Sequence, residues 1–204
     1  MNLEPFVSAH LPAAPARVLE VGCGSGALAF AMARLGHEVL AIDPRAPEGD
    51  LFRLVSLEDL ADPGPFDAVV ANRSLHHIHD LPAAVGKIAR LLGPGGRLLL
   101  HEHAWDVVDE PTLRWFHEHG GRGDWRADHA GLHSSEAMLA ALAPWFAERS
   151  LEWTPYLGGE LGVEPKVERA AIDSGAIRAT GFLYVGERRN AAMTSANRVT
   201  DSEP

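Results

Sequence analysis

The sequence predicts an α/β fold in which helices flank both faces of a doubly wound, mostly parallel sheet. Three observations support this prediction. Short apolar runs typical of buried strands alternate with helix-like segments through the first half of the chain. A glycine-rich turn joins the first run to the first helix, and polar side chains follow several of the runs. With 204 residues, 46% of them hydrophobic, the chain suits one domain with one core.

The elements of the first half follow in order. Residues 1–16 are rich in Pro and Ala and are expected to form an irregular lead-in. Strands are expected at 18–21, 37–43, 51–57, 66–72 and 97–103, and helices at 27–35 and 82–92. Segment 44–50 carries two prolines and a glycine, so the crossover helix after the second strand should be shortened or absent.

The second half is expected to complete the sheet. An amphipathic helix should begin after Ser134, whose hydroxyl suits an N-cap, with Glu136 in its first turn. Segments 147–157 and 179–187 can form a sixth and a seventh strand. Residues 1–189 are therefore expected to be one domain, and the polar residues 190–204 a flexible tail.

The turn after the first strand, VLEVGCGSGALA, is typical of a nucleotide cradle. Gly22, Gly24 and Gly26 allow backbone angles closed to other residues and let a ligand lie against the chain. Glu20 places a carboxylate at the exit of the strand, where it can meet a cation. Gly22, Gly24 and Ala27 also satisfy the looser dinucleotide pattern G-x-G-x-x-A, so the turn alone leaves two cofactor classes open.

Polar residues gather at the ends of the predicted strands. They are Glu20, Asp43, Asn72, His101, Glu102 and His103. Ligands of doubly wound sheets bind at the carboxyl ends of the strands, so these side chains should share one edge. Asp43 lies near the offset at which an acid of the second strand reaches a ribose diol.

Two further segments distinguish the cofactor classes. Together with Glu20 and the G-x-G-x-G turn, FDAVVANRSLHHIHD and IARLLGPGGRLLL resemble, in order and spacing, the class I S-adenosylmethionine (SAM)-dependent methyltransferases. The resemblance covers about residues 17–103. It implies a seven-stranded sheet whose last strand runs antiparallel between the fifth and sixth, and SAM as the cofactor.

The resemblance also implies roles for particular residues. Glu20 and the backbone of Gly22, Cys23, Gly24 and Gly26 would hold the methionine end of SAM. Asp43 would hold the ribose, and the Asn72 backbone would lie near the amino group.

At the adenine position, Ser56 stands where the family usually has an aspartate, and Leu57 supplies a backbone N–H and an apolar face. Either Ser56 or Glu58 would accept the hydrogen bond of the adenine amine.

Residues 105–133, between the fifth strand and the next helix, combine aromatic residues with histidines. A helix should begin at Asp109-Glu110-Pro111 and end at Gly120-Gly121, and 121–133 should be a loop. An insertion here would overhang the cofactor edge, which predicts a substrate lid. The alternative is a surface excursion whose aromatic residues, Trp105, Trp115, Phe116 and Trp125, fill the core.

Candidate bases for a hydroxyl acceptor are His76, His101, His129 and His133. His129 and His133 are four residues apart and could join other histidines or aspartates in a metal site. Proton transfer is the favoured interpretation, and no metal is expected.

The formal net charge of −10 argues against nucleic acid or anionic membrane partners, and the single cysteine excludes an intrachain disulfide. A small-molecule acceptor and a cytoplasmic location are expected, since no long apolar stretch is present. The predicted function is SAM-dependent methyl transfer to a small molecule, with oxygen favoured over nitrogen or carbon.

Two alternatives remain. A nicotinamide-dependent reductase would need a second substrate domain, and neither Tyr156 nor Tyr184 has a lysine four residues on. The other alternative is a SAM-binding regulatory subunit without catalytic activity.

Overall fold

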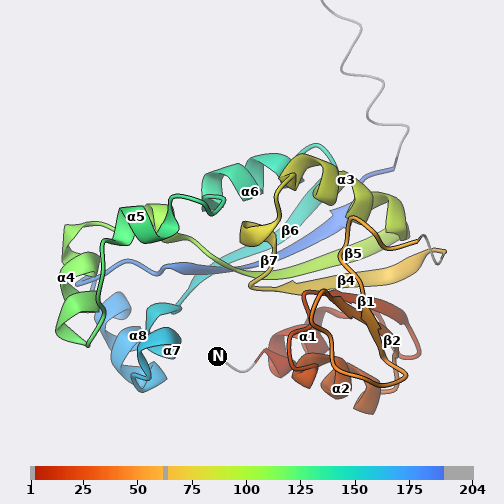
Figure 1. Cartoon of the computed structure of the whole chain (residues 1–204), viewed down its shortest axis with the longest axis horizontal. Helices are drawn as coiled ribbons and strands as arrows, with labels where there is room; N and C mark the ends of the chain where they lie inside the picture. Colours follow the sequence, from red (N-terminus) through yellow and green to blue (C-terminus); the bar gives the residue numbers. More distant parts are fainter. Residues whose placement is uncertain (1–2, 62–63, 191–204) are drawn as a thin grey trace, which may run out of the picture.

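The computed structural model describes residues 3–61 and 64–190 and is built on one seven-stranded sheet (Figure 1). The strands run in the order β3-β2-β1-β4-β5-β7-β6. Their bounds are β1 Arg17–Val21, β2 Glu38–Asp43, β3 Phe52–Leu54, β4 Phe66–Asn72, β5 Leu92–His103, β6 Phe146–Thr154 and β7 Gly181–Arg188. The five neighbouring strands β3, β2, β1, β4 and β5 run parallel to one another, whereas β7 is antiparallel to both β5 and β6. The predicted fold class is therefore confirmed.

Helices cover both faces of this sheet. On one face lie α1 (Glu4–His10) and α2 (Ala27–Arg34), and on the other α3 (Leu81–Leu91) and α6 (Ser135–Leu142) (Figure 1). Side chains alternate between the faces along a strand, so Val18 contributes to a cluster with Met32 of α2, and Leu19 to one with Ile88 of α3. Ser134 caps α6 as predicted, since its hydroxyl accepts from the Ala137 N–H.

The remaining α-helices form a separate group at one end of the molecule, next to α6 and away from α1, α2 and α3 (Figure 1). They are α4 (Glu110–Glu118), α5 (Trp125–His129), α7 (Leu157–Leu161) and α8 (Pro165–Asp173). Trp115, Trp125, Leu157 and Ile177 form their own buried apolar cluster. We call this group, residues 105–133 and 155–178, the cap.

The structure corrects three predictions. The expected irregular lead-in contains α1, which has a proline in its first turn and buries Val7. The expected loop 121–133 contains α5, because the Asp124 carboxylate accepts from the Arg126 and Ala127 N–H groups and caps a helical turn. Segment 155–178, partly assigned to a strand, forms α7 and α8.

Other expectations agree more closely. No helix lies between β2 and β3 within the described chain, as the prolines of 44–50 predict, although β3 is shorter than expected. The predicted helix after Asp109 is α4, with Asp109 as its N-cap. Of the predicted tail, 191–204 lie outside the described residues. None of the described helices is both long and apolar enough to span a bilayer.

Candidate active site

The glycine turn between β1 and α2 has the backbone geometry that its sequence predicts. Gly22, Gly24 and Gly26 have φ values of 75°, 51° and 81°. A Cβ at Gly22 would lie 2.5 Å from the Ser74 Cβ, and one at Gly26 would lie 2.4 Å from the Phe52 ring. A Cβ at Gly24 would meet no described atom within 4 Å, so the middle of the turn faces open space. A ligand can approach the backbone there.

Cys23, between the first two glycines, contributes through its backbone. Its side chain is buried in an apolar cluster with Ala29, Ala41 and Phe52, and its N–H donates to the Ile42 carbonyl at 3.1 Å. Burial raises the pKa of the thiol to about 11. The thiol is therefore protonated at neutral pH.

Glu20 is the buried acid of this site, with an exposed fraction of 2%. Its Oε2 atom has no hydrogen-bond partner among the described residues. Burial raises the pKa of Glu20 to about 8, and the negative charge of Asp43 adds to the shift, whereas an N–H from Ala29 opposes it. An unpartnered carboxyl oxygen at a glycine turn suits a cationic ligand group such as an ammonium.

Asp43 ends β2 beside the same turn. Its carboxylate accepts from the Gly24 N–H at 3.1 Å and from the Arg45 N–H at 2.8 Å. Asp43 thus fixes the glycine turn as well as offering a carboxylate to a ligand.

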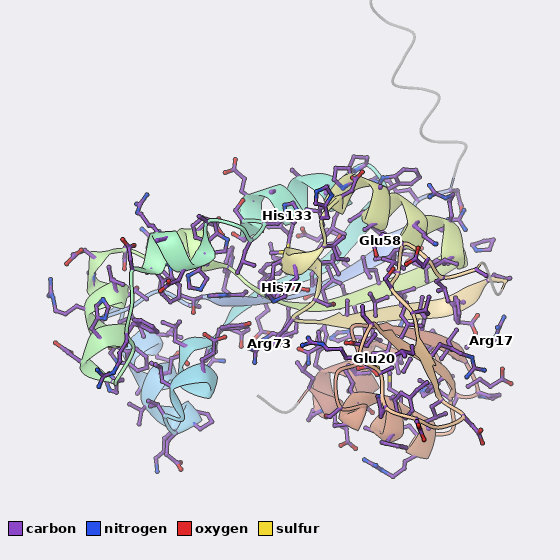
Figure 2. All side chains as sticks on the ribbon, in the orientation of Figure 1. Arg17, Glu20, Glu58, Arg73, His77 and His133 are labelled. Atoms are coloured by element: carbon purple, nitrogen blue, oxygen red, sulfur yellow. The ribbon has the colours of Figure 1, made fainter. Side chains whose placement is uncertain are left out.

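A cavity of about 510 Å³, which we call the first cavity, is lined by five of the ten predicted cofactor residues. It is lined by Gly22, Asp43, Ser56, Leu57 and Glu58, together with residues 73, 74 and 77–79 after β4. The other five predicted cofactor residues, Glu20, Cys23, Gly24, Gly26 and Asn72, are not among its lining residues. Figure 2 shows Arg73 and His77 after the end of β4 and Glu20 nearby, whereas Arg17 lies at the opposite end of the sheet.

The adenine candidates lie in a tight turn at the wall of the first cavity. Ser56 donates its hydroxyl to Asp59 at 2.9 Å and accepts from the Asp59 N–H at 3.2 Å. Lys87 of α3 holds the same turn by donating to the carbonyls of Glu58 and Leu60. Because the Ser56 proton is used, its oxygen can meet a ligand only as an acceptor, the role that an adenine amine requires.

Glu102 and His76 form a buried pair behind the cavity. Glu102 is fully buried on β5 and accepts from the N–H groups of Ser74 and Leu75 at 3.0 and 2.7 Å. Its other oxygen lies 2.5 Å from His76 Nδ1. Glu102 therefore fixes the turn after β4 and the orientation of the His76 ring, a use of this acid that the sequence did not reveal.

His101 lines another cavity, which we call the second cavity, of about 500 Å³. Its Nδ1 lies 3.0 Å from the Asn72 side-chain oxygen, and its Nε2 has no partner among the described residues. Burial lowers the pKa of His101 to about 4, and the charge of Arg73 contributes to the decrease. The ring is neutral at pH 7. Since an amide oxygen only accepts, Nδ1 carries the proton and Nε2 presents a lone pair.

Tyr156 and Arg73 are site residues that sequence reasoning missed. His103 stacks on the Tyr156 ring at 4.2 Å, and burial lowers the pKa of His103 to about 3. The Arg73 guanidinium lies 4.8 Å from the centre of the Tyr156 ring and donates to Glu160 at 2.9 Å. The position of Arg73 directly after the fourth strand was a usable signal. Tyr156, in contrast, was wrongly predicted to belong to the sixth strand, which ends at Thr154.

The two lid histidines are held by backbone contacts. His129 Nδ1 lies 2.7 Å from the Trp125 carbonyl, and His133 Nε2 lies 2.7 Å from the Ile78 carbonyl. No residue of 105–133 is among the described residues lining the first or second cavity, so the substrate lid stays a prediction. Within the described chain, no three His, Cys, Asp or Glu side chains are arranged to hold a metal.

Comparisons with known proteins agree with this geometry. A family model described as "Methyltransferase domain" matches residues 3–154. A curated relative from Xanthomonas oryzae pv. oryzae, named ubiquinone biosynthesis O-methyltransferase, is 47% identical over 111 residues. That match covers 47% of this chain and 46% of the relative, so it spans less than half the length of either protein.

Two solved structures share the fold. An S-adenosylmethionine-dependent methyltransferase from Mesorhizobium loti has a TM-score of 0.62 and 18% identity, covering 90% of this chain and 96% of its own. The N-methyltransferase NodS from Bradyrhizobium japonicum, solved with S-adenosylhomocysteine (SAH), has a TM-score of 0.57 and 15% identity, covering 92% and 84%. Because the family model matches well over half of its residues, the chain belongs to the methyltransferase domain family, and the resemblance to class I SAM-dependent methyltransferases is confirmed.

Proposed function

We propose that this chain is a SAM-dependent methyltransferase that transfers a methyl group to an oxygen of a small-molecule acceptor. The observation that carries the proposal is Glu20 Oε2, a buried, unpartnered carboxyl oxygen beside an open glycine turn. The name of the Xanthomonas relative favours oxygen over nitrogen or carbon as the acceptor atom. The net charge of −10 favours a small molecule over nucleic acid.

The residues around the first cavity fit SAM. Glu20 and the backbone of Gly22 to Gly26 would hold its ammonium-bearing methionine end, Asp43 its ribose, and residues 56–58 its adenine. When bound, SAM supplies a methyl group on a sulfonium: the carbon–sulfur electron pair goes to sulfur as the acceptor oxygen forms the new carbon–oxygen bond.

Among the four predicted bases, His101 is the best placed to take the acceptor proton. Its Nε2 is unpartnered within the described chain, and Arg73, which lines both cavities, places the second cavity beside the first. His76, His129 and His133 also use one ring nitrogen each, on Glu102 or on a backbone carbonyl, but none of these three lines either cavity. A neutral imidazole that accepts the hydroxyl proton at Nε2 contributes about a hundred- to ten-thousandfold in rate.

The proposal is tested by binding and turnover. Calorimetry should detect binding of SAH, but not of NADH, to the chain. Incubation of the chain with SAM and hydroxylated acceptors should release SAH. Glu20→Gln should weaken SAH binding about tenfold or more, since hydrogen bonds to charged groups are worth about 1.5–3 kcal/mol. Glu38→Gln is the matched control, because that side chain is 73% exposed on the neighbouring strand.

Other outcomes distinguish the alternatives. Tight NADH binding without SAH binding would overturn the proposal in favour of a reductase. Normal SAH binding with no methyl transfer to any acceptor would instead identify a SAM-binding subunit.

A further inference from the structure

The second cavity has one wall that lies outside the stretch matched by the family model. Asn72, Arg73 and His101 come from the ends of β4 and β5, within residues 3–154. The opposite wall comes from segment 155–169, which begins where that match ends and includes α7 and the first half of α8. Residues outside the match to the family model therefore form one wall of this cavity.

The wall from α8 carries positive charge. Lys166 and Arg169 are three residues apart on the helix and so lie on the same side of it. Neither makes an ion pair within the part of the chain that the structure describes. Two unpaired cations facing one cavity stand out in a chain of net charge −10.

The acid in the same lining does not neutralise them. Glu168 is 1% exposed, and its oxygens accept from the N–H groups of Tyr156, Leu157 and Gly158 at 2.8, 3.0 and 2.6 Å. The Glu168 carboxylate therefore binds the backbone at the start of α7 rather than Lys166 or Arg169. The third cation, Arg73, is already paired with Glu160. Lys166 and Arg169 remain available to an anion.

A second, independent feature of the cavity also calls for a ligand. The His101 side chain is 6% exposed, and its Nε2 atom is buried without a partner among the described residues. An unsatisfied buried acceptor costs about 1–3 kcal/mol, which a ligand hydroxyl would recover. The rings of His101 and Tyr156, 5.7 Å apart, and the two prolines at 155 and 165 form apolar walls between the acceptor atom and the cations.

We propose that the second cavity binds the methyl acceptor and selects a hydroxylated carboxylic acid, with its hydroxyl on His101 Nε2 and its carboxylate between Lys166 and Arg169. This inference rests on the proposed function and adds the substrate class. A lysine and an arginine match one carboxylate through charge-assisted hydrogen bonds. The flat apolar walls suit an aromatic ring between the two groups.

The test compares an acid with its uncharged ester. The probes are 3,4-dihydroxybenzoate and its methyl ester, each titrated by calorimetry into the full chain saturated with SAH. The acid should bind at least about tenfold more tightly than the ester, because a charged hydrogen bond is worth about 1.5–3 kcal/mol. The double variant Lys166→Ala/Arg169→Ala should lose that preference while its Kd for SAH stays unchanged.

Controls separate charge from position. Arg114→Ala removes an exposed cation of α4 that pairs with Glu110, so it should keep the full preference for the acid. In turnover, the double variant should raise the KM for the acid about tenfold or more with a smaller change in kcat. His101→Phe keeps a ring but removes Nε2, and it should lower kcat with either probe.

The outcomes distinguish this inference from the proposed function. If the wild-type chain binds SAH and methylates phenols but prefers the acid no more than the ester, the second-cavity assignment is wrong and the methyltransferase assignment stands. The same conclusion follows if the double variant keeps the preference. If SAH does not bind at all, the proposed function fails first.

Discussion

The carboxyl edge of the sheet and the cap differ in how the chain builds them. The edge is assembled from consecutive strand ends, and carboxylates hold its turns: Asp43 accepts from the Gly24 N–H, and Glu102 from two N–H groups after β4. The cap joins two segments far apart in sequence through buried side chains, with Trp125 of one packed near Leu157 of the other. The edge carries residues that a sequence pattern can identify, whereas the cap depends on contacts that no local pattern predicts.

The same difference separates the residues expected to bind the cofactor from those expected to select the acceptor. The first cavity, where the cofactor would bind, is lined by strand-end turns inside the matched domain, whereas most of the residues that line the second cavity belong to the cap. Cofactor binding and acceptor choice should therefore respond to different substitutions.

Trp125→Ala should have the largest effect and test whether the cap is an independent unit. Trp125 is 6% exposed and donates its indole N–H to the Trp105 carbonyl at 3.0 Å. Truncating a buried tryptophan costs about 3–5 kcal/mol. We expect hydrogen exchange to quicken across the cap, and the acceptor KM to rise, while the Kd for SAH changes little.

The matched control is Trp153→Ala, which truncates a tryptophan of β6 that is 40% exposed and should cost much less. Loss of SAH binding in Trp125→Ala, with faster exchange throughout the sheet, would mean that cap and edge unfold as one unit.

Glu20 should give the edge a distinctive pH dependence. Its pKa is about 8 in the folded chain against 4.5 for the unfolded reference, so the folded state retains a proton that the unfolded state loses. The contribution of Glu20 to the free energy of unfolding is therefore fully present below pH 4.5. It is lost as the pH rises toward 8, by about 1.4 kcal/mol per pH unit. The wild-type free energy of unfolding, measured against Glu20→Gln, should thus fall by about 3 kcal/mol between pH 5.5 and 7.5.

The same group should link cofactor binding to proton release. Calorimetry of SAH at pH 7 in buffers of different ionisation enthalpy should show a proton leaving the wild-type complex but not Glu20→Gln. Equal proton release by both proteins would assign the titration to another residue.

Asp43→Ala should weaken SAH binding by about 1.5–3 kcal/mol, because a carboxylate that accepts ribose hydroxyls makes charge-assisted hydrogen bonds of that size. Asp43→Asn keeps the side-chain shape and one acceptor oxygen, so its loss should be smaller. The acceptor preference should be unaffected in both. Normal SAH affinity in Asp43→Ala would restrict Asp43 to holding the Gly24 N–H and Arg45 N–H groups.

The sequence predicted the edge well because its signals are local. The glycines, the strand ends at Asp43 and Asn72, and the Ser134 cap each depend on a few neighbouring residues, and the structure has them as expected. The expectation that polar residues gather at the strand ends also located Glu102 correctly. It did not predict the role of Glu102, because the contacts of this residue with the turn after β4 depend on the pairing of β4 with β5.

Apart from α4, which the sequence predicted, the cap could not be predicted in the same way. Helix α7 holds five residues and contains two glycines, which gives little helical signal. Its start is fixed by Glu168, ten to twelve residues later in the chain, through three backbone N–H groups. The partners of Tyr156, namely His103 and Arg73, lie more than fifty residues away in sequence.

Arg73 should give the smallest effect and measure the coupling between the two regions. Arg73 directly follows β4 and has a φ of 57°, and its guanidinium contacts Tyr156 and Glu160 of the cap. Because the Arg73 side chain is 48% exposed, its ion pair with Glu160 should contribute only about 0.2–1 kcal/mol. A double-mutant cycle of Arg73→Ala and Glu160→Ala, followed by chemical denaturation, isolates that coupling energy. Arg73→Gly removes the same contacts but relieves the positive φ, so it should be more stable than Arg73→Ala by about 1 kcal/mol. A coupling energy of zero would leave the cap joined to the edge through the His103–Tyr156 stack and the apolar contacts alone.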